Sequence, residues 1–384
     1  MKNKVIINGG GVAGLAMSLF LKKANIESVL YEQAKAYRKS GGHFVVHPSG
    51  LNMLEMLGLG SEVEKNTHFI TDMAILDKNN NSLIDEDEMA EMGLDEIDLD
   101  DTPPFINAAR YRLIDVLYQE ALRQGIDIRF NKRLNGFTQD KDGVTVTFED
   151  GSTDFGSILI GADGVKSKTR ELLFPFPANP LKYSGKTAVF GMVDNDDLGK
   201  LKDYFTMDTT LMYVDENSIF FVSKHHPSAE EISWSLISER PGKLPKKDFE
   251  EKPVKELKKD IASKFEDWEM PIKELVMTTD HIIAKQLYMI DLMRHYYHGR
   301  VVLIGDALHT ADPFAGMGTT LALEDAMYLA KMLRDNDYED AFYYYEHDRK
   351  PRAEKVYKSA ELINDPDAKF EDFAIFDEGI DAVW

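Results

Sequence analysis

The sequence contains no cysteine. Its 384 residues therefore cannot form a disulfide, and they offer no thiolate nucleophile, no iron–sulfur cluster and no cysteinyl link to a cofactor. A chain without cysteine fits a reducing compartment, so we expect a cytoplasmic protein. The sequence also lacks an HExxH spacing, and we expect no metal site.

Long apolar runs and an excess of positive charge are missing as well. No run reaches the roughly 18 residues that a membrane helix needs, and the start at Met1 shows no signal-peptide pattern. The 45 basic and 67 acidic residues give a net charge of −22, which repels nucleic-acid phosphates and anionic lipids. We therefore expect neither a nucleic-acid nor a membrane partner.

The residues that are present predict an α/β protein. Hydrophobic residues make up 43% of the chain, enough for a sizeable core in one large or two intergrown domains. Residues 182–239 contain four strand-like stretches, which indicate a mostly antiparallel β-sheet domain. The buried-type strand at 301–304 indicates a return to the first domain near Ile282. We expect a discontinuous Rossmann-like domain at 1–180 and 280–335, a substrate domain at 181–279 and a helical segment at 336–384.

A dinucleotide site is predicted at the N-terminus. Gly9, Gly11 and Gly14 have GxGxxG spacing between a predicted strand at 4–8 and a helix at 15–23. Such a turn brings backbone N–H groups and the helix dipole to a pyrophosphate. After the second strand, at 28–31, Glu32 stands where an acidic residue accepts hydrogen bonds from a ribose hydroxyl. The pattern does not by itself separate FAD from NAD, and a chance glycine turn is the alternative.

Four further segments, in order along the chain, carry a family resemblance. Arg110-x-x-Leu113 is followed by Asp-Gly-Val-Lys-Ser-Lys-Thr-Arg at 163–170, by Gly-Asp-Ala-Leu-His at 305–309 and by Tyr-Glu-x-x-Arg-x-Pro-Arg at 345–352. Together with the glycine turn, these segments resemble the single-component, class A FAD monooxygenases built like para-hydroxybenzoate hydroxylase. The resemblance implies a Rossmann-like FAD domain, non-covalently bound FAD, and NADPH or NADH as a transient reductant.

The resemblance also implies cofactor contacts. Asp306 would accept hydrogen bonds from the ribityl chain of FAD, and Gly316 and Gly318 would let the isoalloxazine approach backbone N–H groups. Asp163 and Arg170 would shape the cofactor and nicotinamide region, although a turn and an ion pair at a helix end are equally compatible with them. The residues expected at the cofactor are Gly9, Gly11, Gly14, Glu32, Gln33, Arg110, Asp163, Asp306, Pro313, Gly316, Met317 and Gly318.

The substrate pocket is expected between the isoalloxazine and the antiparallel sheet. Its candidate lining residues are large and apolar, although such residues more often pack a core. They are Phe190, Met192, Phe221, Trp234 and Phe314. Residues 38–50 are similar to a loop of the tetracycline-inactivating flavin monooxygenases, where the position of Arg38 would attract NADPH. The roles of His43 and His47 stay open.

The function expected from this resemblance is an NAD(P)H-dependent FAD monooxygenase. Through a flavin C4a-hydroperoxide it would insert one oxygen atom from O₂ into an aromatic or polycyclic small molecule, with phenolic and tetracycline-like compounds included, and with no catalytic protein nucleophile. A flavin-dependent reductase or dehydrogenase, or a catalytically silent flavin- or drug-binding protein, is the alternative. The sequence contains only one complete GxGxxG pattern, which argues against a second dinucleotide domain. We also expect the protein to be a monomer.

Overall fold

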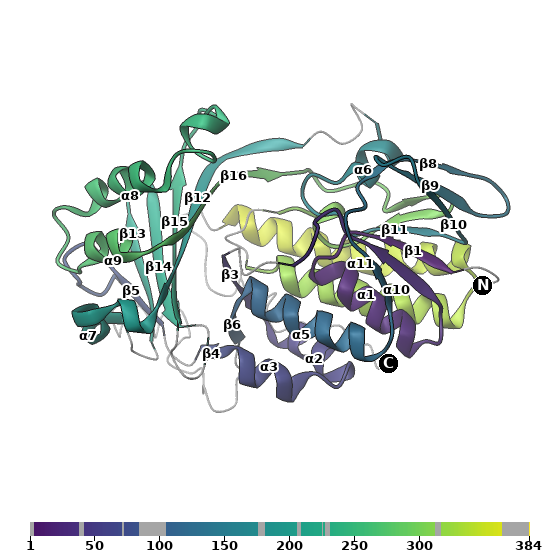
Figure 1. The fold of residues 1–384 in the computed structure, drawn as a ribbon, viewed down its shortest axis with the longest axis horizontal. Helices are drawn as coiled ribbons and strands as arrows, with labels where there is room; N and C mark the ends of the chain where they lie inside the picture. The colour runs from purple at the N-terminus through teal and green to yellow at the C-terminus, as the bar shows by residue number, and fades with distance from the viewer. Residues whose placement is uncertain are drawn as a thin grey trace.

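The computed structural model describes residues 4–37, 42–70, 73–83, 105–175, 181–205, 209–224, 226, 231–311, 316–362 and 384. This part of the chain is built around two six-stranded sheets (Figure 1). The first sheet carries the N-terminal βαβ unit. The second lies beside it, with helices α8 (Val254–Ala262) and α9 (Ile272–Thr278) on the face turned away from the first.

The first sheet is parallel except for the strand at one edge, β17. Its strands, in spatial order, are β17 (Tyr297–His298), β18 (Val301–Leu303), β11 (Leu159–Gly161), β1 (Val5–Asn8), β2 (Ser28–Tyr31) and β7 (Asp127–Arg129). Helix α1 (Val12–Lys23) packs on this sheet and against α5 (Arg110–Arg123) and α10 (Gly318–Asp335). A helix covered on several sides must be apolar all round, and α1 is buried from Ala13 to Leu21. The predicted strand–turn–helix–strand start is confirmed.

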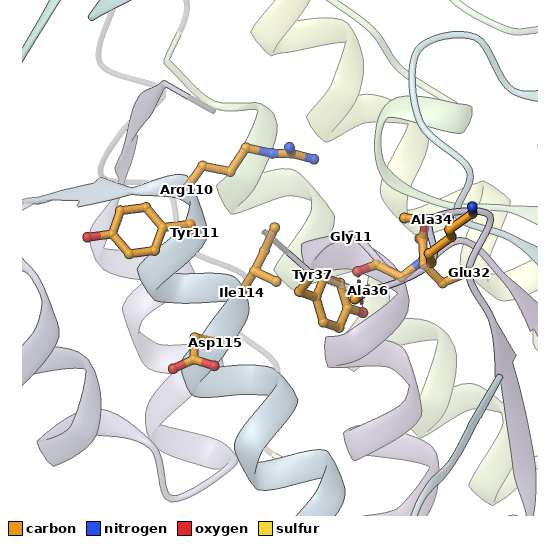
Figure 2. A pocket seen from close by; sticks show the side chains of 11 residues that line it. Gly11, Glu32, Ala34, Ala36, Tyr37, Arg110, Tyr111, Ile114 and Asp115 are labelled. Carbon is orange, nitrogen blue, oxygen red and sulfur yellow. Dashed lines mark hydrogen bonds between the residues drawn. The ribbon is translucent and has the colours of Figure 1, made fainter. Parts of the chain in front are cut away.

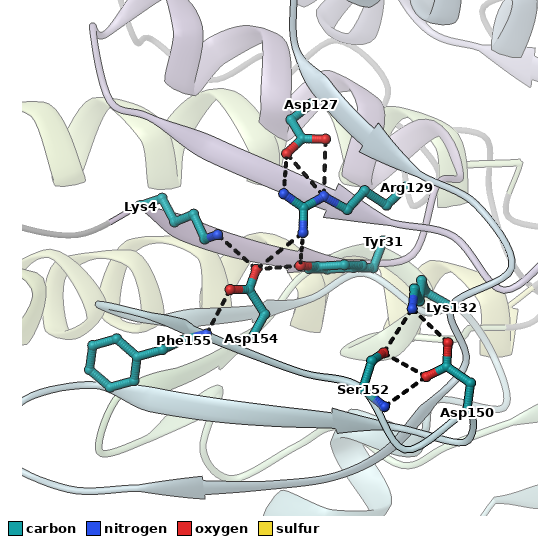
Figure 3. A network of polar contacts seen from close by, with 9 residues as sticks. All are labelled: Lys4, Tyr31, Asp127, Arg129, Lys132, Asp150, Ser152, Asp154 and Phe155. Atoms are coloured by element: carbon teal, nitrogen blue, oxygen red, sulfur yellow. Dashed lines mark hydrogen bonds and ion pairs between the residues drawn. The ribbon is translucent and has the colours of Figure 1, made fainter.

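A small antiparallel sheet packs on the face of the first sheet opposite α1, and a polar network also joins the two sheets (Figure 3). It consists of β8 (Leu134–Gln139), β9 (Val144–Phe148) and β10 (Thr153–Gly156). The carboxylate of Asp154 in β10 accepts hydrogen bonds from Tyr31 and, at 2.8 Å, from Lys4. Arg129 donates to the Tyr31 hydroxyl at 3.1 Å. The half-buried Asp154 therefore joins β10 to strands β2 and β7.

The second sheet is antiparallel apart from one edge pair. Its strands, in spatial order, are β16 (His281–Met289), β12 (Lys182–Asp194), β15 (Glu231–Glu239), β14 (Ser218–Lys224), β13 (Thr210–Asp215) and β5 (Met73–Leu76). Strand β5 runs parallel to β13. The side chains of Phe220, Trp234 and Leu236 form its core with Phe265 and Leu275 from the covering helices.

Two strands of this sheet lie outside the range expected for the second domain. Residues 281–289 were expected to return to the first domain, but β16 pairs along β12 from Met192–His281 to Lys182–Met289. Strand β5 comes from the first part of the chain and closes the opposite edge. Pairing partners so distant in sequence leave no local signal, which explains why the expected boundaries at 181 and 279 differ from those of the sheet.

The remaining described elements are a third small sheet, helices and 3₁₀ turns. A three-stranded sheet is formed by β3 (His43–Val46), β6 (Phe105–Ala109) and β4 (His68–Ile70). The other helices are α2 (Pro48–Met56), α3 (Gly60–Asn66), α6 (Lys168–Leu173), α7 (Lys202–Phe205) and α11 (Tyr338–Leu362), and 3₁₀ turns cover Asn195–Asp197, Gly199–Leu201, Lys246–Asp248, Ser263–Phe265 and Gly305–Ala307. Within the described ranges, no helix combines the length and apolarity needed to cross a membrane.

A glycine in β12 tests how tightly the core of the second sheet is packed. A Cβ at Gly191 would lie 2.2 Å from the indole of Trp234, so Gly191→Ala should lower the free energy of unfolding by about 1–3 kcal/mol through overpacking. Urea denaturation measures the change. Gly136→Ala in β8 is the matched control, because a Cβ there meets no described atom within 4 Å. Equal losses in the two variants would contradict the packing at Gly191.

Candidate active site

The predicted glycine turn has the geometry of a phosphate site. Gly9 has φ +115°, and a Cβ there would lie 2.4 Å from the Ala162 carbonyl oxygen; one at Gly14 would lie 1.9 Å from the oxygen of Gly9. At Gly11, by contrast, a Cβ would meet no described atom within 4 Å. Gly11 is also the N-cap residue of α1 and makes no side-chain capping hydrogen bond. The first N–H groups of the helix therefore face open space. An anion can approach them there.

A cavity of about 500 Å³ extends from this turn (Figure 2). Glu32 lines it at the end of β2, where its carboxylate accepts hydrogen bonds from the N–H groups of Gly10 at 2.8 Å and Ala34 at 2.7 Å. The Tyr37 hydroxyl donates to the Gly10 carbonyl at 2.7 Å. Gln33, next to Glu32, is exposed and does not line this cavity.

Arg110 lies on the other side of the cavity from Glu32. It is the first residue of α5, and its backbone N–H donates to the Gly42 carbonyl at 3.0 Å, which joins α5 to the strand β3. Its side chain is exposed and extends away from the helix in Figure 2. Arg110 therefore brings a positive charge into an otherwise acidic protein beside the glycine turn.

The loop between β18 and α10 carries Asp306 in the 3₁₀ turn Gly305–Ala307. Gly305 has φ +56°, and the Asp306 side chain is exposed. A Cβ at Gly318 would lie 3.7 Å from the Asp306 carboxylate. Although the side chain is exposed, desolvation by the surrounding protein raises the pKa of the Asp306 carboxyl. The charges of nearby His309 and Arg110 act to lower that pKa. An exposed carboxylate next to a glycine can accept hydrogen bonds from a ligand's hydroxyl groups.

The same loop contains further residues that the sequence predicted at the site. Gly316 has φ +63°, and a Cβ there would lie 3.4 Å from Nε2 of His47. Met317 is buried and packs with Leu321 and Val356, so its side chain anchors the start of α10. The predicted residues Arg38, Pro313 and Phe314 lie outside the described residues.

Asp163 and Arg170 hold the turn after β11. The Asp163 carboxylate accepts hydrogen bonds from Asn8 at 3.0 Å, from the Thr169 N–H at 2.9 Å and from Ser167 at 2.5 Å. Burial raises its pKa. The Arg170 guanidinium donates to the carbonyls of Val165 at 2.6 Å and Ala307 at 2.9 Å. Both side chains are thus engaged within the protein, and Arg170 ties this turn to the loop that carries Asp306.

A buried charge cluster behind the Asp306 loop was not among the predicted site residues. Asp325 in α10 accepts hydrogen bonds from Arg349 at 3.0 Å and from the Gly305 N–H at 2.9 Å, and it lies 2.6 Å from Nε2 of His309. Its neighbour Glu324 lies 2.7 Å from Arg349. We call Glu324, Asp325, Arg349, Arg352 and His309 the α10–α11 charge cluster. The sequence signals for it were His309, at the end of the segment 305–309, and the arginines at 349 and 352.

Opposite charges decide the protonation states in this cluster. Burial raises the pKa of Asp325, but His309 and Arg349 outweigh it and hold that pKa well below its usual range. Burial alone would lower the pKa of His309, yet the Asp325 carboxylate outweighs it and raises the pKa. The cluster therefore holds ionised carboxylates and favours a protonated His309.

The second sheet turns a mixed aromatic and polar face toward the first sheet. Phe190, Met192 and Phe221 alternate with the core residues, and the strand register places Ser235 between Phe190 and Phe221. Phe190 and Phe221 are half-buried and Ser235 is buried. We call this side of the sheet, opposite α8 and α9, the inner face. The structure brings these three of the predicted substrate residues to one surface.

Trp234 does not belong to the inner face. It is fully buried on the helix-covered side, stacked on Phe220 at 5.4 Å, and its indole donates to Thr279 at 2.8 Å. The sequence showed the alternation along β15 but not which side the helices cover. The expectation that Trp234 lines the substrate pocket is therefore wrong.

His43 and His47 lie on the side of the first domain that meets the second sheet. The His43 ring stands edge-on to Phe190 at 6.4 Å, and a Cβ at Gly42 would lie 2.4 Å from the Phe190 ring. Burial lowers the pKa of His43 to about 4, and burial and Arg352 lower that of His47 to about 4. Both imidazoles are neutral near pH 7.

This fold and site define an α/β protein with a dinucleotide-type glycine turn and cavity at the start of α1. Residues 2–360 match the family model described as an FAD binding domain. The chain belongs to this family, the class A flavin monooxygenases, and is an FAD-dependent monooxygenase; the family uses FAD with NAD(P)H as reductant. The fold class and the family expected from the sequence are confirmed.

The individual relatives are only distantly similar to this chain in sequence. The FAD-dependent urate hydroxylase of Klebsiella pneumoniae is 28% identical over 339 residues, which cover 86% of this chain and 81% of that protein. The crystal structure of Klebsiella pneumoniae HpxO complexed with FAD and uric acid has a TM-score of 0.74 at 24% identity, covering 98% of this chain and 93% of that one. Tetracycline destructase Tet(51) has a TM-score of 0.72 at 22% identity, covering 95% and 91%. Both solved structures have the same fold as this chain.

The residues present fit an FAD. The open position at Gly11 and the uncapped start of α1 suit its diphosphate, and Glu32 stands where a ribose hydroxyl can donate. The exposed Asp306 carboxylate beside Gly318 suits the ribityl hydroxyls. Bound there, FAD would supply redox chemistry that no protein side chain provides.

Removing the Asp306 carboxylate should weaken FAD binding. Because hydrogen bonds to a charged group are worth about 1.5–3 kcal/mol, Asp306→Ala should raise the Kd for FAD by about tenfold or more. Flavin fluorescence during titration of the apoprotein measures the Kd. Asp197→Ala, an exposed carboxylate in the 3₁₀ turn after β12, is the control. A Kd that is the same in both variants would remove Asp306 from the FAD site.

The raised pKa of His309 gives a pH-dependent stability. A group whose pKa is raised on folding contributes stability that is fully present below its unfolded pKa of 6.5 and is lost as pH rises through the folded pKa. His309→Gln keeps a donor for Asp325 but cannot titrate. The wild type should therefore be more stable than this variant by about 1–3 kcal/mol at pH 6, and the gap should narrow above that pH.

Urea denaturation from pH 6 to pH 9 measures this gap. His295→Gln provides the control, because the His295 side chain is 59% exposed. A gap for His309→Gln that stays constant over this range would show that the His309 imidazole does not titrate there.

Proposed function

We propose that this monooxygenase inserts one oxygen atom from O₂ into a planar aromatic or heteroaromatic molecule, monocyclic or polycyclic, that carries an electron-donating hydroxyl group. The observation that carries the proposal is the row formed by Phe190, Ser235 and Phe221 on the inner face. These residues are register neighbours on three adjacent strands, β12, β15 and β14.

The spacing of this row suits one flat ring. Neighbouring strands lie about 4.8 Å apart, so the backbones at Phe190 and Phe221 are about 10 Å apart, and aromatic pairs are favourable at centroid distances of about 4.5–7 Å. A planar ring between the two phenylalanines would contact both. The buried Ser235 hydroxyl at the base of this row can hydrogen-bond a polar ring substituent.

The surrounding side chains favour an uncharged or enolic substrate. Met192 and Met212 extend the inner face, and these flexible apolar side chains adapt to ring systems of different size. His43, at the edge of Phe190, is held neutral by burial. A neutral imidazole can accept a hydrogen bond from a phenolic or enolic hydroxyl and so orient the ring.

Bound FAD supplies hydride acceptance from NAD(P)H and activation of O₂, as in the rest of the family. The chain's own residues orient the ring, and the backbone at Gly42, which packs against Phe190, shields one end of the row from water. The names of relatives support this substrate class: urate is a planar oxygenated heteroaromatic compound, and tetracycline is a polycycle with phenolic and enolic hydroxyls.

The test is a substrate screen with the FAD-loaded protein. NADPH and NADH consumption and peroxide release are followed with phenols, hydroxylated N-heterocycles, purines and tetracyclines. At least one compound should stimulate consumption and incorporate one oxygen atom from labelled dioxygen. Flavin reduction by NAD(P)H without incorporation of oxygen into any of these classes would contradict the proposed substrate class.

A variant of the row then separates substrate contact from cofactor binding. Phe221→Ala should raise the KM of the stimulating compound by about tenfold, because a buried aromatic contact is lost, and leave FAD binding unchanged. Phe155→Ala, an exposed phenylalanine in β10, is the matched control. If the KM were equal in the two variants, Phe221 would not contact the substrate.

A further inference from the structure

A buried carboxylate of the second sheet holds the first turn of helix α5. Glu231 is the first residue of β15, and its side chain is only 4% exposed. Its Oε2 atom accepts a hydrogen bond from the Tyr111 hydroxyl at 2.6 Å and lies 3.3 Å from the Arg112 guanidinium. Tyr111 and Arg112 are the second and third residues of α5. These contacts therefore join the second sheet to the helix that packs against α1.

The first turn of α5 needs such an anchor. Its N-cap residue is Ala109, which makes no side-chain capping hydrogen bond. The buried residues of the helix begin at Leu113, so apolar packing holds the body of α5 but not its start. Helix ends that lack a cap fray. The helix dipole favours a carboxylate near an N-terminus, which suits Glu231 to this position.

The two contacts also fix the direction in which Arg110 points. Successive residues of an α-helix project about 100° apart around its axis. Tyr111 and Arg112 can therefore reach the same carboxylate only in one rotation of the first turn. In that rotation the preceding residue, Arg110, points away from Glu231 and into the FAD cavity. Figure 2 shows the Tyr111 ring and the Arg110 side chain on opposite sides of the start of α5.

The charge of Arg110 reaches groups on both sides of the FAD cavity. Desolvation raises the pKa of the Asp306 carboxyl and of the Tyr37 hydroxyl, and the charge of Arg110 acts against that rise in both. The Arg110 side chain is itself exposed, so its own packing does not fix its direction. Its direction depends on the backbone of the first turn, which Glu231 holds.

We infer that Glu231 is a positioning residue that directs the Arg110 charge into the FAD cavity. It acts through the side chains of Tyr111 and Arg112. A buried ion pair contributes little net stability compared with apolar packing, and its best attested role is to select one geometry. The alternation along β15 places Glu231 on the same side as Ser235, at the end of the inner face. A residue of the second sheet would thus help to set the affinity for FAD.

The test is a double-mutant cycle on the Kd for FAD, measured by flavin fluorescence during titration of the apoprotein. Glu231→Ala should raise the Kd about fivefold in the wild-type background, because the Arg110 charge is no longer held in the cavity. In the Arg110→Ala background the same substitution should leave the Kd unchanged, because the group through which Glu231 acts is gone. Equal effects in the two backgrounds would overturn the inference.

A milder variant covers the case in which Glu231→Ala folds poorly. Tyr111→Phe removes only the hydroxyl and keeps the ring that lines the cavity. It should raise the Kd for FAD about threefold, and only where Arg110 is present. An unchanged Kd in Tyr111→Phe would overturn the inference, whether or not Glu231→Ala folds.

Glu120→Ala is the matched control. Glu120 belongs to the same helix and accepts hydrogen bonds from Arg123, but it lies at the end of α5 away from Arg110. It should leave the Kd for FAD unchanged, and a rise equal to that in Glu231→Ala would show a general effect of helix stability and contradict the positioning role. FAD binding needs no substrate, so a failed substrate screen would leave this inference intact.

Discussion

The α10–α11 charge cluster is the constraint on which the FAD side of the active site depends. Two carboxylates at adjacent positions in α10 are buried completely, and each has an arginine of α11 as its partner. Removing one partner from such a group leaves an uncompensated buried charge at a cost of about 3–5 kcal/mol. The same carboxylates bind the Gly305 N–H and the Ser49 hydroxyl, so the loop with Asp306 and helix α2 take their positions from this cluster.

The two sides of the site are built by different means. On the FAD side, backbone conformation does the positioning: Gly9 and Gly14 allow contacts that no side chain would fit, and Arg170 joins two loops through their carbonyl groups. On the proposed substrate side, side chains do the positioning, because the pleat of the second sheet alternates between the core with Trp234 and the inner face with Phe190. The first side can keep one cofactor while the second changes with the substrate, which agrees with the different compounds named for the relatives.

The sequence predicted the features that depend on neighbouring residues. The strand–turn–helix start, the strands at 182–239 and helix α10 all have local periodicity, and the structure contains them. Features that depend on distant pairing were missed. Strands β5 and β16 join the second sheet across long stretches of chain, and Trp234 was placed on the wrong face because the sequence does not show where α8 and α9 pack. The charge cluster escaped notice for the same reason, since its acids and bases lie 16 or more residues apart.

The charge of the protein restricts where a dinucleotide can bind. A net charge of −22 disfavours any dianionic ligand at long range, so an anion binds only where local donors outweigh that field. The uncapped N–H groups at the start of α1 are such donors, and the open position at Gly11 lets an anion approach them. Arg110, which lines the same cavity, adds a positive charge there. A diphosphate is therefore attracted by local groups although the protein as a whole repels it.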